Sequence, residues 1–590
     1  MINHRIQELR EEMKKEGISI YFIPTQDYHL SEMVGDYFQA RRYMSGFTGS
    51  NGDLIVTLDE ALLWTDGRYF LQAENQLQGS FIKLKKMGQE GVETVSEYIE
   101  THIKEGEALG FDGKVVSANL GIRFNEIVNR HKASIKCDID LVGRIWKNRP
   151  KMSTEKAFEL GVKYAGVDRL TKIKNLEGTL TEKGYDATVI TSLDDIMWLY
   201  NIRGNDVECT PVTLSYTIVG KNGAVLYIND NCLSNELKDT LAKDGVIIRD
   251  YFDIYEDIKT LEGKVYFDLN NLNYALYNSF STKAILYKGM NFTTLPKACK
   301  NPVEQENVKL AHIKDGVALV KFIYWLKKNV GKIDMTELSV SSKLEEFRRL
   351  SNTFVEPSFT TICGYNAHGA IVHYSATEET DAKIDAQGLL LVDSGGQYLE
   401  GTTDVTRTIV LGKVSDQCKR DFTNVLKGYL ALSKAVFKEG TRGSSLDVLA
   451  RKALWENAQD FNHGTGHGVG YFLNVHEGPQ SIHFGRVTAY PFQEGMLTSD
   501  EPGMYITNEY GIRHESLLLC KKYVKNEYGQ FYNFEVVTLA PFDLEGINVD
   551  MLTDEEKKTL NEYHKNVYNV LKDYLNDEEK HFLKEATKEI

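Results

Sequence analysis

The sequence of 590 residues lacks the features of a secreted, membrane-spanning or nucleic-acid-binding protein. Its seven cysteines are odd in number, dispersed and without a CxxC pair, so we expect reduced thiols in a cytoplasm. No apolar run approaches the roughly 20 residues of a membrane helix, and the charged start has no secretory apolar core. The formal net charge of −15 argues against nucleic acid or an anionic membrane as the main partner.

Several common catalytic motifs are absent as well. There is no GxSxG elbow and no phosphate-binding loop that ends in Gly-Lys-Ser/Thr. Neither His476-Glu477 nor His514-Glu515 has a second histidine four residues after the first, which excludes the helical zinc-protease motif. The string HGTGHGVG at 463–470 fails the dinucleotide pattern because Val469 stands where a glycine is needed.

Two aspartates follow or precede short β-prone runs. The apolar run 389–392 ends at Asp393, immediately before Ser394 and two glycines, and 402–410 is a second β-branched run that contains Asp404. A hairpin between the runs would place the two carboxylates side by side, where they repel one another unless protons or cations intervene. The alternative is that both are ordinary aspartates of strand ends or turns.

Three further ligand-type residues lie in similar settings. His467 lies in a glycine-rich loop that lets the backbone approach another group closely, although solvated histidines in a structural loop are the alternative. Glu501 ends a strand-like run before Pro502-Gly503. Glu515 directly precedes the apolar run 516–520, and a buried carboxylate there needs a partner.

These five side chains, Asp393, Asp404, His467, Glu501 and Glu515, together predict a site for two divalent metal ions. Four carboxylates and one imidazole form a hard to borderline donor set, so we expect Mn²⁺, with Co²⁺, Fe²⁺ or Zn²⁺ as alternatives. Two ions about 3.5–4 Å apart lower the pKa of a shared water and supply hydroxide near neutral pH.

Several segments of the chain resemble those of a known family. DSGGQYLEGTTDVTRTI, HGTGHGVGYFLNVHEGP, SDEPGMY and GIRHES resemble the catalytic domain of aminopeptidase P, in the metallopeptidase group that includes prolidase, methionine aminopeptidase and creatinase. SGFTGSNG, WTDGRYF, LDDIMWLYNIRGNDVE and AHIKDGVAL extend the resemblance to the three-domain cytosolic Xaa-Pro aminopeptidases. The family usually has an apolar residue at His514, which on a strand would point away from Arg513 and Glu515.

The resemblance implies a role for each matching residue. Asp393 and Asp404 would bind one metal, His467 and Glu501 would complete the second together with Asp404, and Glu515 would bridge both. Glu501 would accept a proton, and His373 and His476 would contact the peptide and donate hydrogen bonds to the intermediate. The substrate-binding set would be Arg68, His373, His467, His476 and Glu501, while His463 and Arg513 orient ligands without binding metal. Without the resemblance, the favoured interpretation of His373 is a half-buried structural histidine, and Arg68 is equally a surface arginine near a turn.

The fold expected is α/β and α+β in several domains. Gly17 and Gly184 each end a helical segment before a strand, and the matching spacings to Asp27 and Asp194 indicate a weak internal repeat of two related α/β domains. We place these creatinase N-terminal-like domains at 1–150 and 151–303, with polar linkers near 147–151 and 297–306. A pita-bread catalytic domain occupies 304–590, opened by an amphipathic helix from Asn307 and closed by charged helices that cap the domain or an oligomer contact.

The function predicted is therefore release of the N-terminal residue from peptides with proline in the second position. The proline preference comes from the resemblance alone. A prolidase-like dipeptidase and a catalytically inactive peptide-binding homologue are the alternatives, of which the second requires lost metal ligands. We also expect a cytoplasmic homodimer whose partners are peptides, with neither nucleic acid nor membrane bound.

Overall fold

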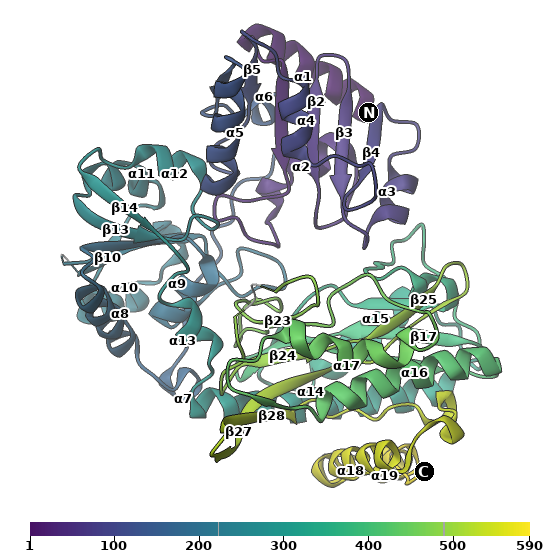
Figure 1. Ribbon diagram of the computed structural model, residues 1–590. Helices are drawn as coiled ribbons and strands as arrows, with labels where there is room; N and C mark the ends of the chain where they lie inside the picture. The colour runs from purple at the N-terminus through teal and green to yellow at the C-terminus, as the bar shows by residue number, and fades with distance from the viewer. Residues whose placement is uncertain (222, 488–489) are drawn as a thin grey trace. The chain divides into compact units, whose positions relative to one another are not determined.

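The computed structural model describes residues 1–221, 223–487 and 490–590, and the chain divides into two units (Figure 1). Unit 1 consists of Met1–Leu160 and Val167–Thr293, and unit 2 consists of Gly161–Gly166 and Thr294–Ile590. Within the described residues the seven cysteines form no disulfide. No helix in that part of the chain is both long and apolar enough to span a bilayer.

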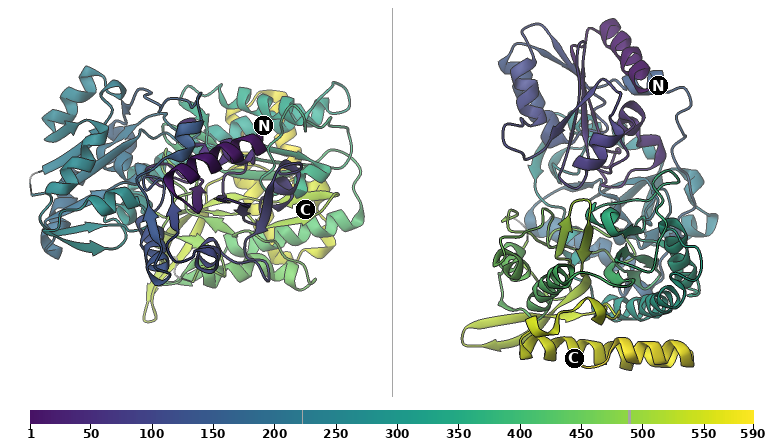
Figure 2. Two further views of the ribbon diagram at one scale, coloured as in Figure 1. Left: turned by 90° about the horizontal axis from the view of Figure 1, so that it is seen from above. Right: turned by 90° about the vertical axis from the view of Figure 1, so that its right-hand side faces the viewer.

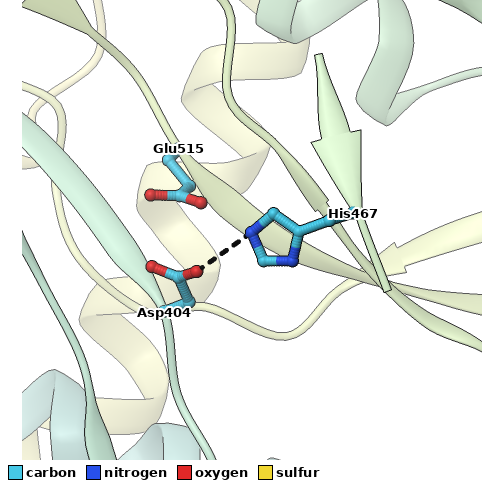
Figure 3. Close-up of side chains that lie close together, drawn as sticks. All are labelled: Asp404, His467 and Glu515. Atoms are coloured by element: carbon cyan, nitrogen blue, oxygen red, sulfur yellow. Dashed lines mark ion pairs between the residues drawn. The ribbon is translucent and has the colours of Figure 1, made fainter. Parts of the chain in front are cut away.

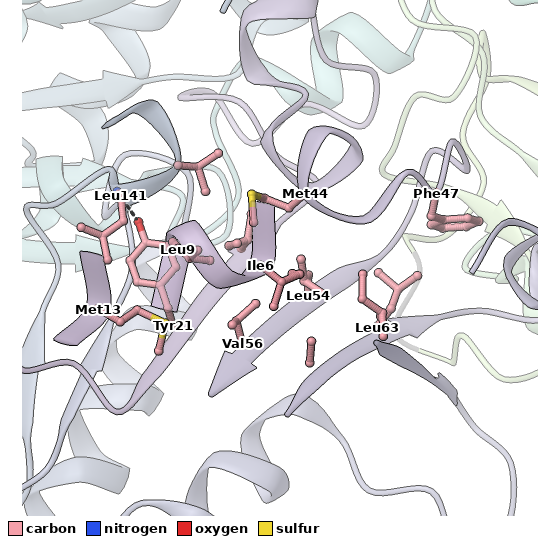
Figure 4. Packing of buried hydrophobic residues seen from close by; sticks show 14 of the residues in the cluster. Ile6, Leu9, Met13, Tyr21, Met44, Phe47, Leu54, Val56, Leu63 and Leu141 are labelled. Atoms are coloured by element: carbon pink, nitrogen blue, oxygen red, sulfur yellow. Dashed lines mark hydrogen bonds between the residues drawn. The ribbon is translucent and has the colours of Figure 1, made fainter. Parts of the chain in front are cut away.

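Unit 1 begins with a six-stranded sheet of order β4-β3-β2-β1-β5-β6. Its strands are β1 (Ile20–Pro24), β2 (Asp53–Thr57), β3 (Ala61–Thr65), β4 (Ile82–Lys86), β5 (Ala108–Gly110) and β6 (Ser134–Lys136). One face packs Tyr21, Leu54, Val56 and Leu63 against Ile6, Leu9 and Met13 of α1 (Ile2–Glu16) (Figure 4). The other face packs Phe22, Ile55, Leu62 and Trp64 against α4 (Val95–His102) and α5 (Ala118–Arg130). Because strand side chains alternate, consecutive apolar residues fill both faces of this sheet.

The second sheet of unit 1 repeats this topology. Its order is β12-β11-β10-β8-β13-β14, built from β8 (Ala187–Ile190), β10 (Ser215–Gly220), β11 (Gly223–Ile228), β12 (Val246–Arg249), β13 (Gly263–Phe267) and β14 (Ala284–Lys288). The parallel and antiparallel pairings follow the same sequence in both sheets. Gly17 and Gly184 end α1 and α8 (Arg169–Lys183) in the left-handed conformation that glycine tolerates. The predicted pair of related α/β domains is confirmed.

Unit 2 contains the long helix α14 (Pro302–Asn329), which begins five residues before the predicted Asn307. Asn301 caps it, Glu304 completes a capping box, and Pro302 lies at the first helical position, where its missing N–H is harmless. The expectation of a linker at 297–306 is also wrong. Within this range, α13 (Thr294–Ala298) and α14 leave only residues 299–301 outside helices.

The sheets of unit 2 are short and mostly antiparallel. Two sheets have three strands each: β16 (Ile362–Tyr365), β17 (Leu389–Ser394) and β20 (Val405–Val410) form one, and β15 (Phe354–Pro357), β18 (Gly396–Tyr398) and β19 (Gly401–Thr402) form the other. A four-stranded sheet has the order β21 (Val436–Lys438), β28 (Gly529–Val536), β27 (Ser516–Asn526) and β24 (Leu497–Asp500). Two further sheets are strand pairs, β22 (Gly466–His467) with β23 (Ser481–Ile482) and β25 (Gly503–Ile506) with β26 (Tyr510–Arg513). Leu390 and Val392 of β17 pack against α14 and α15 (Glu337–Arg348), whereas Leu389 packs against α16 (Asp416–Ser433). Helices on both sides therefore bury β17 completely.

The charged C-terminal segment forms α18 (Asp554–Leu571) and α19 (Asp577–Ala586). In Figure 2 they are the yellow pair along one edge of unit 2. Val567, Leu571 and Leu583 of these helices bury their side chains with Val320 of α14 and Leu539. The two helices thus cap unit 2, one of the two roles expected from the sequence.

Candidate metal centre

The predicted hairpin that carries the two aspartates is present. Strand β17 pairs antiparallel with β20, so that Asp393 lies opposite Thr406 and Ser394 opposite Val405. Between them, β18 and β19 form a second hairpin, and Asp404 directly precedes β20. Asp393 is 7% exposed and Asp404 4% exposed, so neither is an ordinary surface aspartate. The carboxylates lie at the buried edge where the two strands meet.

Three predicted ligands converge at this edge. Asp404, His467 and Glu515 each offer an oxygen or nitrogen atom, and these atoms all lie within 4.8 Å of one another. Figure 3 shows the three side chains pointing toward one another, with His467 Nε2 3.3 Å from Asp404 Oδ2. His467 comes from β22 and Glu515 from the junction between β26 and β27, so tertiary packing joins residues far apart in sequence.

The other two predicted ligands border this cluster. Glu501 Oε1 lies 3.5 Å from His467 Nε2 and accepts a hydrogen bond from Ser499 Oγ at 3.1 Å. Asp393 Oδ2 lies 2.5 Å from Arg513 Nη2, while its buried Oδ1 atom has no hydrogen-bond partner among the described residues. A buried oxygen of this kind is a suitable cation ligand, because leaving it unpaired is costly.

The carboxylates in and around this cluster outnumber the positively charged side chains beside them. Burial raises the pKa of Glu515 well above its ordinary value, and Asp404 and Asp393 raise it further. Burial likewise raises the pKa of Glu501 to about 7. Burial alone would lower the pKa of His467, but hydrogen bonding to Asp404 and the charge of Glu501 raise it to about 9. Such carboxylates ionise together only beside cations, so this oxygen-rich donor set with one imidazole fits divalent metal ions.

Glycines in the 463–470 loop permit the close packing that the sequence predicted. A Cβ atom on Gly466 would lie 1.9 Å from the Ser499 carbonyl oxygen, and one on Gly468 would lie 2.0 Å from that of Glu477. The His467 backbone N–H donates to Ser499 Oγ at 2.9 Å. Its Nδ1 lies 3.0 Å from the Gly468 carbonyl oxygen, which fixes the proton there and leaves Nε2 facing the carboxylates.

Arg513 and His463 lie around the cluster and meet at Tyr505. Arg513 Nη1 donates to Tyr505 Oη at 2.7 Å, and His463 Nε2 lies 2.8 Å from the same oxygen. Arg513 Nε also contacts Thr406 Oγ1, which donates to Glu515 Oε2 at 2.7 Å. Sequence reasoning missed Tyr505 and Thr406, although Thr406 follows Asp404 by two positions and therefore shares its face of the strand.

His514, the departure from the family pattern, points away from the cluster. Its fully buried ring lies 4.3 Å from Phe422 and 5.4 Å from Phe542, measured between centroids. Burial lowers the pKa of His514 to about 3, so the ring is neutral at physiological pH. The segment at His514 is a break between β26 and β27, yet the expected alternation of side chains holds.

The remaining predicted residues are His476, His373 and Arg68. The His476 ring is 4.3 Å from that of His467 and inclined by 73°. His373 lies half-buried in a turn that follows the 3₁₀ helix η5 (Asn366–Ala370). Arg68 lies in unit 1, where its Nε and Nη2 atoms donate to the two oxygens of Asp66, each at 2.8 Å.

Four family models together match most of the chain. Residues 306–522 match metallopeptidase family M24, and 530–590 match the C-terminal region of peptidase M24. Residues 5–138 and 148–304 each match the creatinase/prolidase N-terminal domain.

Individual relatives are similar over nearly the full length. Aminopeptidase P2 of Arabidopsis thaliana is 38% identical, with 96% of this chain and 86% of the relative covered. Xaa-Pro aminopeptidase 1 of Dictyostelium discoideum is 37% identical, covering 96% and 92%. The crystal structure of X-prolyl aminopeptidase from Caenorhabditis elegans, described as a cytosolic enzyme with a di-nuclear active site, superposes with a TM-score of 0.95 at 33% identity and covers 100% of both chains.

Proposed function

Because the chain belongs to the aminopeptidase P family of M24 metallopeptidases, we propose that it removes the N-terminal residue from peptides whose second residue is proline. The observation that carries this proposal is the convergence of Asp404, His467 and Glu515, bordered by Glu501 and Asp393. A homologue that binds peptides without cleaving them would have no need of so many buried acids. The full-length similarity to Xaa-Pro aminopeptidases favours this activity over that of a prolidase.

Two divalent ions are the cofactors of the proposed reaction. Asp393 and Asp404 would hold one ion, His467 and Glu501 would complete the site of the other with Asp404, and Glu515 would contribute to both. When bound, the ions lower the pKa of water and polarise the peptide carbonyl. The donor set favours Mn²⁺, and metal analysis of the purified protein would separate it from Co²⁺, Fe²⁺ or Zn²⁺.

The chain's own residues move protons and hold the substrate. Glu501 accepts the proton of the attacking water on its carboxylate and returns it to the leaving nitrogen. That transfer matters before proline, because the scissile nitrogen is a tertiary amide without a hydrogen of its own. His373 and His476 donate hydrogen bonds to the tetrahedral intermediate, and Arg68 contacts the peptide. Arg513 orients Asp393, and His463 acts through Tyr505.

A panel of four peptides tests the assignment. We expect cleavage of Xaa-Pro-Yaa and a longer Xaa-Pro peptide, with far slower cleavage of Xaa-Ala-Yaa. The dipeptide Xaa-Pro separates the proposal from a prolidase-like dipeptidase. Cleavage of the dipeptide alone would identify a dipeptidase, and cleavage of no peptide by the fully metallated protein would identify a binding homologue.

Replacement of His373 by alanine separates catalysis from folding. Loss of one hydrogen-bond donor to the intermediate should reduce kcat by roughly 10²-fold or more. Metal content and melting temperature should stay close to wild type. If His373 is instead a structural residue, the variant should lose about 1–3 kcal/mol of stability and keep its rate per folded molecule.

The matched control is His131→Ala, at another half-buried histidine that follows α5 in unit 1. It should leave kcat and metal content unchanged. A normal kcat in His373→Ala would remove His373 from the catalytic residues.

The proposal extends to the compartment, the oligomeric state and the domain boundaries of the enzyme. We propose a cytoplasmic homodimer, in keeping with the C. elegans relative described as a cytosolic enzyme. We propose domain boundaries at 1–150, 151–303 and 304–590. Light scattering and subcellular fractionation would test the oligomeric state and the compartment.

A further inference from the structure

Glu337 is a buried carboxylate in unit 2, remote in sequence from the proposed metal ligands. Among the described residues, one segment of the chain supplies all of its hydrogen-bond donors. Glu337 is the first residue of α15 and is 0% exposed. Its donors are the Tyr365 N–H at 2.7 Å, the Tyr374 hydroxyl at 2.7 Å, the Ala382 N–H at 3.1 Å and His368 Nδ1 at 2.9 Å. All lie within residues 365–382, which we term the His373 segment because His373 lies inside it.

The arrangement ties both ends of the His373 segment to one point. Tyr365 precedes the turn and Ala382 follows it, and the Glu337 N–H also donates back to the Ala382 carbonyl oxygen at 3.1 Å. Tyr374 is the next residue after His373. Hydrogen bonds to a carboxylate are stronger than those between neutral groups, and a buried carboxylate that lost them would be costly. Glu337 and the segment therefore fix each other.

The segment in turn packs against the strands of the proposed metal centre. Tyr374 is buried in one cluster with Leu391 of β17, and Ile371 and Tyr505 pack against that cluster. Leu391 lies two residues before Asp393, and Tyr505 accepts the hydrogen bond of Arg513. Ile371 and Tyr374, on either side of His373, thus pack in the same cluster as a neighbour of Asp393 and a hydrogen-bond partner of Arg513.

Backbone packing allows the turn little freedom. Gly511 of β26 approaches Gly369 so closely that a Cβ atom on Gly511 would lie 1.7 Å from the Gly369 carbonyl oxygen. A glycine is therefore required at Gly511, and η5 is held against β26. Strand β26 fixes one side of the His373 segment, and Glu337 fixes both of its ends. The position of His373 therefore depends on the Glu337 carboxylate.

We propose that Glu337 is a positioning residue, which holds His373 at the place where it donates to the reaction intermediate. The inference rests on the proposed function, because it gives Glu337 a role in that reaction through His373. Glu337 touches neither substrate nor metal in this proposal. The Tyr374 hydroxyl is the contact of Glu337 that comes from the residue next to His373.

A double-mutant cycle of Tyr374→Phe with His373→Ala tests the proposal with the full-length metallated enzyme. Tyr374→Phe removes one hydroxyl donor to Glu337 and keeps the ring in its cluster. We expect kcat on Xaa-Pro-Yaa to fall roughly 10- to 100-fold, the scale for loss of an outer partner of an active-site group, with KM nearly unchanged. In the His373→Ala background the same change should reduce kcat no further.

The matched control is Tyr227→Phe in unit 1. The Tyr227 hydroxyl donates to Asp257 Oδ2 at 2.7 Å, the length of the Tyr374 contact with Glu337, and its side chain is similarly buried. This variant should keep the wild-type kcat. Hydrogen exchange should accelerate at residues 366–380 in Tyr374→Phe and not in Tyr227→Phe.

Glu337→Gln should reduce kcat more than Tyr374→Phe, because an amide presents one acceptor oxygen to donors that now share two. If Glu337→Gln fails to fold, the cycle with Tyr374→Phe still decides. Losses that multiply in the double variant, or an unchanged kcat in Tyr374→Phe, would overturn the positioning role. A wild-type protein that leaves every Xaa-Pro peptide intact would overturn the proposed function itself, so the two failures are distinguishable.

Discussion

Replacing Glu515 by glutamine is expected to abolish peptide cleavage and to lower bound metal at the same time. Glu515 is 1% exposed, and its carboxylate faces Asp404 and His467. Glutamine keeps the shape and can still accept the Thr406 hydrogen bond, but it removes the negative charge and one ligand oxygen of the proposed bridge. Since Lewis-acid stabilisation contributes several kcal/mol, kcat/KM should fall by at least roughly 10³-fold.

The measurement is metal stoichiometry together with the rate on one Xaa-Pro-Yaa peptide. The matched control is Glu579→Gln on α19, where the carboxylate lies 2.7 Å from Lys321 Nζ and is also largely buried. That variant should keep its metal and its activity. Full metal occupancy with near-normal turnover in Glu515→Gln would contradict a two-metal site bridged by this residue.

Acetylation of the substrate's N-terminus is expected to block cleavage, with kcat/KM lower by roughly 10⁴-fold, the scale on which a polar site rejects a substrate lacking the group it binds. The proposed enzyme releases the first residue, so a free amine must lie beside the metal centre. A carboxylate-rich centre favours an amine that carries a charge or offers a lone pair. The acetyl amide is neutral, its lone pair is delocalised, and it adds bulk.

The control peptide carries a C-terminal amide and a free N-terminus. It should be cleaved at nearly the normal rate, because the far end of a longer peptide is not the group that is recognised. Mass spectrometry of both reactions gives the products directly. Equal rates on acetylated and free peptides would indicate an endopeptidase and reject the proposal.

Local sequence signals predicted much of the architecture. Gly17 and Gly184 indicated two helix ends before strands, and the two sheets of unit 1 share one topology. The turn after Asp393 predicted the pairing of β17 with β20. These features depend on backbone conformation and on alternation of apolar residues, both of which a short window of sequence contains. The pattern of apolar residues misses the start of α14, because the cap at Asn301 and Pro302 begin the helix five residues before Asn307.

The sequence by itself determined which ligand-type residues the chain has and, through its motifs, the family to which it belongs. Only the tertiary structure decided that Asp404, His467 and Glu515 converge, since two helices separate Asp404 from His467 and four strands separate His467 from Glu515. It also decided the surroundings of Glu337, whose donors follow it by 28 to 45 positions. No local pattern marks such a residue, because a buried carboxylate is identified by the donors that satisfy it, and folding alone brings those donors together.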